Sequence, residues 1–210
     1  MSTASHWDAI YRDKGEAQTS WFRPHLEESL RLIGTLRLGL DAPIVDVGGG
    51  RSSLVDDLLL RGFRDVSVLD VSEAALAQAR QRLDANAASA QWIVGDVIEI
   101  ELPKARYALW HDRAVFHFLT EPGERTRYVA AAARAVRADG YVILSTFALD
   151  GPERCSDAPV CRYEAMMLEA MFAPAFEHVV SGRFIHVTPA GHPQPFTHIV
   201  LRRRTDAARA

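Results

Sequence analysis

The sequence predicts an α/β fold in which a mostly parallel sheet is covered by helices and closed by a C-terminal antiparallel hairpin. Short β-branched runs alternate with helical patterns between residues 43 and 149, three consecutive glycines follow the first run, and two strand-like runs end the chain. Alternation of this kind is typical of βαβ units, whose strands pair in parallel.

Length and composition limit the possible functions. A chain of 210 residues with 48% hydrophobic residues can bury one sizeable core, so we expect a single domain. The net charge of −3 gives no general attraction to nucleic acid. The N-terminal stretch has no apolar segment typical of a signal peptide, and no run approaches the roughly 20 apolar residues that cross a bilayer. We expect a cytoplasmic protein that binds neither nucleic acid nor a membrane.

The predicted elements follow in order along the chain. Strands are expected at residues 43–47, 65–71, 90–97, 107–113 and 140–149, with helices at 52–62, 72–83 and 121–137. Gly62 is suited to a left-handed C-cap, Ser72 to an N-cap and Pro122 to a first helical turn. After a long loop, one further helix is expected at residues 165–171, and the hairpin at residues 178–189 and 194–204.

The glycines after the first strand are a candidate ligand-binding turn, because glycine lets a ligand approach the backbone closely. Two ligand classes use a strand, a glycine turn and a helix with an acidic residue roughly 20 positions later. The dinucleotide fingerprint G-x-G-x-x-G requires glycine where this chain has Ser53. The pattern acid-x-G-x-G fits instead, with Asp46, Gly48 and Gly50, and Asp70 ends the second strand.

In the order and spacing of these motifs and of Gly95-Asp96, the sequence resembles the class I S-adenosylmethionine-dependent methyltransferases over most of its length. The resemblance implies a Rossmann-like, seven-stranded sheet with helices on both faces, and methyl transfer that releases S-adenosylhomocysteine. Family members often carry a third glycine where this chain has Ser52.

The resemblance also assigns roles in cofactor binding. Gly48, Gly49 and Gly50 would lie against the amino-acid part of S-adenosylmethionine, and Asp46 would act on its ammonium group. A carboxylate at position 70 suits the acceptance of hydrogen bonds from both ribose hydroxyls. The remaining expected cofactor contacts are Asp96 at the adenine amine, Val97 beside the ring, Val71 and Trp21.

Acceptor residues are expected after the fourth strand, because ligands of open α/β sheets bind at the carboxyl ends of the strands. His111, Asp112 and His117 are the candidates for acceptor binding or proton removal. The alternative is that each of them is a hydrogen-bonded packing residue.

The segments flanking the expected cofactor-binding core, residues 41–150, are candidates for the acceptor site. Residues 1–40 are expected to form a helical lid, although their aromatic side chains could instead anchor a helix to the core. The W-D-x-x-Y start resembles small methyltransferases of uncharacterised substrate and one lineage of elongation-factor lysine methyltransferases. Residues 151–210 would supply an acceptor loop and the hairpin. Cys155 and Cys161, in that loop, could capture a thiophilic species or be incidental, and no metal site is predicted.

The sequence therefore predicts methyl transfer from S-adenosylmethionine to a small-molecule acceptor. The alternatives are a protein-lysine methyltransferase and a non-catalytic S-adenosylmethionine-binding protein. A nicotinamide-dependent oxidoreductase is disfavoured by Ser53.

Overall fold

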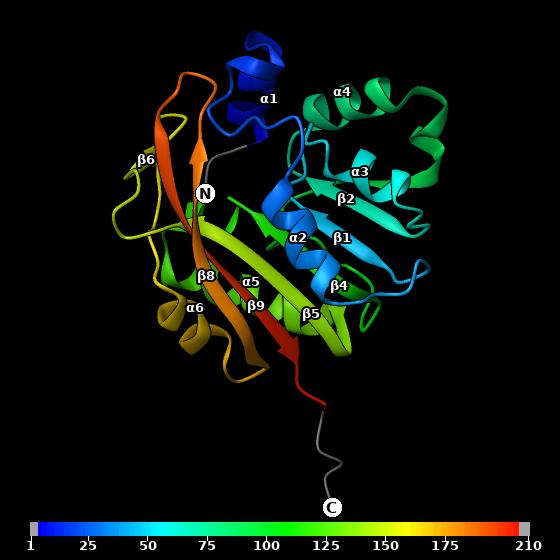
Figure 1. Ribbon diagram of the computed structural model, residues 1–210, viewed down its shortest axis with the longest axis vertical. Coiled ribbons are helices and arrows are strands. Elements are labelled where there is room, and N and C mark those ends of the chain that lie inside the picture. The colour runs from blue at the N-terminus through cyan, green and yellow to red at the C-terminus, as the bar shows by residue number, and fades with distance from the viewer. Residues whose placement is uncertain (1–3, 206–210) are drawn as a thin grey trace, which may run out of the picture.

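A computed structural model describes residues 4–205 of the chain and contains a seven-stranded sheet of order β3-β2-β1-β4-β5-β9-β8 (Figure 1). Five strands pair in parallel: β1 (Ile44–Val47), β2 (Val66–Asp70), β3 (Ala90–Val94), β4 (Tyr107–Arg113) and β5 (Val136–Phe147). The hairpin of β8 (Phe176–Val187) and β9 (Pro193–Arg203) completes the sheet, with β9 antiparallel to β5. The predicted fold class is confirmed.

Helices cover both faces of this sheet. They are α1 (Ala4–Asp13), α2 (Glu27–Thr35), α3 (Leu54–Leu60), α4 (Glu73–Leu83), α5 (Pro122–Ala135) and α6 (Ala165–Phe172). Short 3-10 turns span Glu16–Gln18, Asp84–Ser89 and Phe116–Phe118, and a small two-stranded sheet joins β6 (Arg154–Cys155) to β7 (Ala158–Pro159). Within the described residues, no helix is long and apolar enough to span a bilayer.

Alternation along the strands gives the sheet two apolar faces. Ile44 in β1 packs with α2 and α3, whereas its neighbour Val45 packs in the cluster that includes α5 and α6. Successive side chains of a strand point to opposite faces, so a strand buried on both sides reads as a continuous apolar run.

The predicted helix signals are present, with one shift in boundary. The Ser72 hydroxyl accepts a hydrogen bond from the Ala75 amide at the start of α4, and Pro122 begins α5. The helix expected to reach residue 137 ends at Ala135, and the following strand starts earlier than expected. The reason is that Val136 is already extended (φ −78°, ψ 129°) and pairs with Tyr107 of β4.

The segment predicted as a lid, residues 1–40, divides into two parts in the structure. Leu30, Leu32 and Ile33 of α2 are buried against the sheet, so this helix belongs to the core. The part before it, including α1, lies beside α4 at the end of the sheet (Figure 1). Residues 1–3 of the expected lid and 206–210 of the expected C-terminal segment lie outside the described residues.

Candidate functional site

The turn after β1 accommodates glycine alone at its three central positions. Gly48 has φ +65°, and a Cβ there would lie 1.9 Å from Cγ2 of Val115. A Cβ on Gly49 would lie 2.6 Å from Cγ1 of Val68, and one on Gly50 would lie 2.7 Å from the Tyr11 hydroxyl. The turn therefore presents bare backbone at the end of the sheet, with no room for side chains.

We expect Gly48→Ala to destabilise the protein by about 1–3 kcal/mol, because it combines positive φ with overpacking against Val115. Gly34→Ala is the matched control: this glycine lies within α2 with no atom within 4 Å of its Cβ position, and alanine there should stabilise by about 0.5–1 kcal/mol. Urea unfolding of both variants measures the difference. Equal effects of the two substitutions would show that the turn tolerates a side chain.

Two clefts open on either side of this turn. The Asp70 cleft has a volume of about 740 Å³, part of it open to solvent, and is lined by Trp7, Tyr11, Trp21, Val47, Gly48, Leu69, Asp70, Val71, Gly95, Val97, Arg113, Ala114, Val115, Phe118 and Cys155. The Asp46 cleft, of about 520 Å³, is lined by Tyr11, Thr19, Trp21, Phe22, Arg23, Leu26, Asp46, Gly48, Gly49, Arg51, Ser52, Ser53, His111 and Arg113. Four residues line both clefts: Tyr11, Trp21, Gly48 and Arg113. A ligand lying over the glycine turn could therefore contact both.

Asp70 is a buried carboxylate at the end of β2. Its Oδ1 accepts a hydrogen bond from the Ser72 amide at 2.7 Å, and the side chain is 7% exposed. Burial raises the pKa of Asp70 to about 7, although hydrogen bonds from the amides of Ser72 and Gly50 act in the opposite direction. Burial thus destabilises the ionised form of Asp70 in the cleft. A carboxylate in such a position is well suited to accept hydrogen bonds from a ligand.

Asp46 is held by a histidine on the neighbouring strand. His111 lies opposite it in the register of β1 and β4, with its Nδ1 2.7 Å from Asp46 Oδ1. The His111 Nε2 lies 2.8 Å from the hydroxyl of Ser29 in α2. This buried chain fixes the carboxylate of Asp46 beneath the glycine turn.

The predicted adenine region comes together at the ends of β2 and β3. Val71, Gly95 and Val97 line the Asp70 cleft. The Asp96 carboxylate does not line either cleft, and its Oδ1 accepts a hydrogen bond from the Ile98 amide at 3.1 Å. Gly50 likewise contributes through its amide to Asp70 and does not line a cleft.

Asp112 lies outside both clefts and is bonded within the core. Its carboxylate is fully buried and accepts hydrogen bonds from the Val115 amide at 2.9 Å, the Phe116 amide at 3.0 Å and the Tyr128 hydroxyl. These contacts hold the turn that follows β4, and the expected contact of Asp112 with an acceptor stays a prediction.

His117 is also directed into the core. Its ring packs against Phe118 and Phe147, with centroids 4.6 Å apart in both pairs, and its Nδ1 accepts from the Phe147 amide at 3.3 Å. Burial lowers the pKa of His117 to about 3, so the ring is neutral and weakly basic at neutral pH. It lines neither cleft, and its expected contact with an acceptor stays a prediction.

The N-terminal segment closes the Asp70 cleft from above. Asp8 of α1 accepts hydrogen bonds from the Ser72 hydroxyl at 2.6 Å and the Ala74 amide at 3.2 Å, at the N-terminus of α4. The Gln78 amide nitrogen donates to the Tyr11 carbonyl at 2.7 Å. Trp7 meets Phe118 edge to face, with centroids 5.0 Å apart. Polar contacts thus dock α1 on α4, and aromatic contacts fix it over the cleft.

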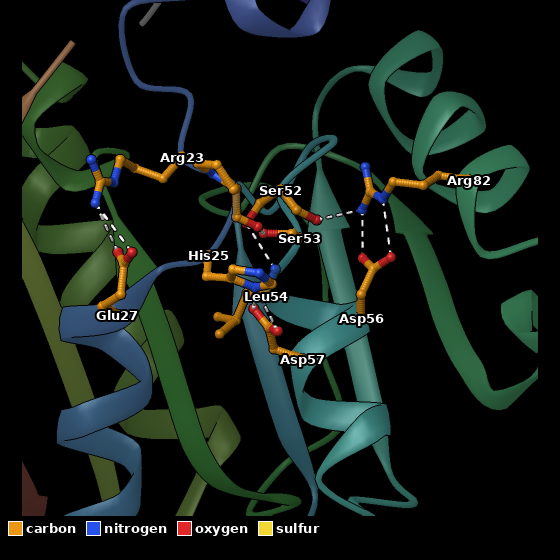
Figure 2. A network of polar contacts seen from close by, with 10 residues as sticks. Arg23, His25, Glu27, Ser52, Ser53, Leu54, Asp56, Asp57 and Arg82 are labelled. Atoms are coloured by element: carbon orange, nitrogen blue, oxygen red, sulfur yellow. Dashed lines mark hydrogen bonds and ion pairs between the residues drawn. The ribbon is translucent and has the colours of Figure 1, made fainter. Parts of the chain in front are cut away.

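A second set of contacts ties the segment between α1 and α2, and also α4, to the start of α3 (Figure 2). The Ser53 hydroxyl donates to the Pro24 carbonyl at 2.7 Å, and His25 Nδ1 lies 2.9 Å from Asp57. Arg82 reaches from α4 to pair with Asp56 and to bond the Ser52 carbonyl at 2.7 Å. The end of the N-terminal cover is therefore anchored at the start of α3.

Sequence reasoning did not single out Arg113, which lines the Asp70 cleft. Arg113 ends β4 and lines both clefts, one position beyond the predicted pair of His111 and Asp112. Its place at the end of a strand was the signal that could have found it. Cys155 also lines the Asp70 cleft, and burial raises the pKa of its thiol to about 11.

The two cysteines occupy different surroundings. Cys161 lies outside the clefts, with its sulfur 3.7 Å from the Arg125 guanidinium. Both cysteines are free thiols, and residues 4–205 contain no cluster of three or more His, Cys, Asp or Glu side chains suited to a metal ion. This arrangement gives no support to a shared thiol site.

Comparisons with known proteins agree with this geometry. Residues 44–140 match the family described as "Methyltransferase domain". The eEF1A lysine and N-terminal methyltransferase of Bos taurus is 24% identical over 154 residues, which cover 69% of this chain and only 22% of that protein.

Solved structures share the fold over nearly the whole chain. A protein from a study of the conversion of a disulfide bond into a thioacetal group during echinomycin biosynthesis superposes with a TM-score of 0.78, at 18% identity, over 98% of this chain and 93% of that one. The Burkholderia thailandensis 1,6-didemethyltoxoflavin-N1-methyltransferase, with bound 1,6-didemethyltoxoflavin and S-adenosylhomocysteine, superposes with a TM-score of 0.74, at 22% identity, over 96% and 87%. Residues 44–140 therefore match a methyltransferase domain, and the chain has the fold of the solved Burkholderia thailandensis methyltransferase, with the glycine turn beside Asp70 inside the matched residues.

Proposed function

We propose that the protein transfers the methyl group of S-adenosylmethionine to a small-molecule acceptor bound in the Asp70 cleft. The observation that carries this proposal is the cover over the cleft. Trp7, Tyr11 and Trp21 form part of its lining, and the loop after β5 contributes Cys155. Concave pockets lined mainly by apolar and aromatic side chains, with a few polar groups, are typical of small-ligand sites.

The residues around the glycine turn fit the proposed cofactor. Bare backbone at Gly48 and Gly49 leaves room for the methionyl part, with Asp46 beneath it for the ammonium group. Asp70 would accept hydrogen bonds from the ribose, and Val71 and Val97 would contact the adenine.

The cofactor supplies an electrophilic methyl group on a sulfonium, so the protein's own task is to orient the acceptor and exclude water. We infer that His111 positions Asp46, that Asp112 positions the turn carrying Val115, and that Trp21 helps to close the site. None of His111, Asp112 and His117 is proposed as a general base. Asp112 and His117 line neither cleft, and both ring nitrogens of His111 lie within hydrogen-bond distance of Asp46 and Ser29.

Labelled methyl transfer tests the acceptor class. The protein would be incubated with methyl-labelled S-adenosylmethionine and with the small-molecule and protein fractions of a cell extract, separated by ultrafiltration. We expect label in the small-molecule fraction and none in lysine. Calorimetric titration with S-adenosylhomocysteine and NAD gives the matched binding test, in which only the first should bind.

A second candidate is protein-lysine methylation, which the similarity to the eEF1A lysine and N-terminal methyltransferase favours. Label recovered as methyllysine, with none in the small-molecule fraction, would contradict the first proposal and support this one. Binding of S-adenosylhomocysteine without labelling of either fraction would indicate a non-catalytic binding protein.

A further inference from the structure

Arg113 carries a half-buried positive charge, and no acidic side chain that the structure describes forms an ion pair with it. Its guanidinium has five N–H donors. Its Nη1 donates a hydrogen bond to the Trp21 carbonyl at 3.2 Å. The Cζ atom lies 5.3 Å from the centroid of the Phe196 ring. Asp46 and Glu27, whose charges act on Arg113, pair instead with His111 and Arg23.

The neighbouring Arg23, unlike Arg113, forms an ion pair within the described part of the protein. Arg23, which lines the Asp46 cleft, pairs with Glu27 at 3.1 Å. Burial, together with the charge of Arg23, lowers the pKa of Arg113 to about 10, although the charges of Asp46 and Glu27 act in the opposite direction. A half-buried charge without an ion pair loses part of its hydration, and its position at the end of a strand in a cleft favours a ligand contact.

The remainder of the Asp70 cleft indicates what kind of molecule would bring the negative charge. Its walls include the rings of Trp7, Trp21 and Phe118 and the side chain of Val115, which suit a flat apolar body. Asp70 is the only acidic side chain among the described residues lining it, and the proposed ribose contact occupies that carboxylate. A cationic acceptor such as a lysine side chain would therefore meet Arg113 with no acid to balance its charge.

We propose that the acceptor is a flat, largely apolar monoanion whose carboxylate pairs with Arg113, and that this ion pair orients the nucleophile toward the sulfonium. This inference rests on the proposed function. A lone pair of the acceptor's nucleophile forms the new bond to the methyl carbon, the carbon–sulfur electrons return to sulfur, and any proton on the nucleophile leaves to water. One guanidinium balances one negative charge, and its planar fork matches a carboxylate.

Two probes of nearly equal shape and different charge, 1-naphthoate and 1-naphthamide, test this by calorimetry on the S-adenosylhomocysteine complex. The wild-type complex should bind naphthoate about tenfold to a hundredfold more tightly than naphthamide. Arg113→Met should abolish this preference, and Arg113→Lys should keep part of it. Arg64→Met is the matched control, because Arg64 pairs with Asp41 at 2.6 Å outside both clefts, and the preference should remain intact in it.

The same variants separate an acceptor contact from other roles of Arg113. The melting temperature of Arg113→Met should stay close to that of the wild type, because an unpaired charge contributes no ion pair to the fold. Its affinity for S-adenosylhomocysteine should fall much less than its affinity for naphthoate. Equal losses would assign the guanidinium to the cofactor's own carboxylate and overturn the inference, as would a wild-type complex that binds both probes equally or neither. A wild-type protein that does not bind S-adenosylhomocysteine would contradict the proposed function itself.

Discussion

Replacing Asp70 with alanine should weaken the binding of S-adenosylhomocysteine by about 1.5–3 kcal/mol, the range for hydrogen bonds that involve a charged group. The carboxylate lies in the cleft with its Oδ1 bonded to the Ser72 amide, so the proposed ribose contact would be its main ligand interaction. Isothermal titration calorimetry measures the loss. Asp41→Ala is the matched control, because this carboxylate pairs with Arg64 outside both clefts.

The pH dependence of binding provides an independent check on Asp70. Its pKa of about 7 in the free protein means that part of the population is protonated at neutral pH. Ribose hydroxyls donate to the ionised form, so the affinity for S-adenosylhomocysteine should rise between pH 6 and pH 8. The rise should reach at most about tenfold per pH unit below the pKa of Asp70 and should level off above it. Asp70→Asn cannot ionise and should remove the part of the rise that comes from this side chain. A folded alanine variant with wild-type affinity would refute the assignment.

The opposite sign is expected for stability. The folded-state pKa of Asp70 is raised above the usual aspartate value of 3.8, so the native state binds this proton more tightly than the unfolded chain. The contribution of Asp70 to the free energy of unfolding should therefore decrease as pH rises from about 4 to about 7. Ligand affinity and stability should thus change in opposite directions over part of this range, as expected of a carboxylate kept for binding.

Deleting residues 1–24 should leave a folded protein whose turnover falls by about a hundredfold or more, because the acceptor and the sulfonium would lose their cover and their alignment. The two large core clusters on the faces of the sheet contain no residue before Leu26. Trp7 and Trp21 pack instead against the smaller cluster of Phe118, Phe147 and Phe196. Cooperative melting should therefore persist while affinity for S-adenosylhomocysteine declines.

A milder pair of variants tests the same cover in the full chain. Asp8→Ala removes the acceptor for Ser72 and Ala74 and should lower turnover and cofactor affinity by loosening α1. Arg12→Ala, on the same helix, removes an exposed pair with Asp8 and should have little effect, because exposed ion pairs contribute at most about 1 kcal/mol. An unfolded truncation would show that the aromatic residues are part of the core. Undiminished activity would place the cover elsewhere, in the loop from Asp150 to Tyr163.

The sequence was most informative where local chemistry and topology act together. Three glycines before a helix require a turn with positive φ or close approach, and the structure has φ +65° at Gly48 and φ +50° at Gly50. Parallel strands end at one edge of the sheet, so Asp46 and Asp70 could be placed there without coordinates. Ser72 could also be predicted as an N-cap from the sequence, because capping depends only on neighbours within one helical turn.

The prediction was weaker for residues whose role depends on side-chain direction. His111, Asp112 and Arg113 are consecutive on β4, and successive side chains of a strand alternate between faces. His111 bonds Asp46 and Ser29 on one side, whereas Asp112 bonds Tyr128 of α5 on the other. The sequence pattern indicated that side chains of this strand alternate between the two faces of the sheet. It did not indicate on which face each polar side chain would find a hydrogen-bond partner.

By itself, the sequence determined the class of fold, the glycine turn and the acidic residues at the strand ends, because these follow from spacing along the chain. Only the tertiary structure decided which polar residues face the ligand. His117 is enclosed by Phe118 and Phe147, while Arg113 lies in the cleft next to the carbonyl of Trp21, a residue 92 positions earlier. Burial and charge balance depend on contacts between segments far apart in sequence, and those contacts exist only once α1, β4 and the C-terminal hairpin have packed together.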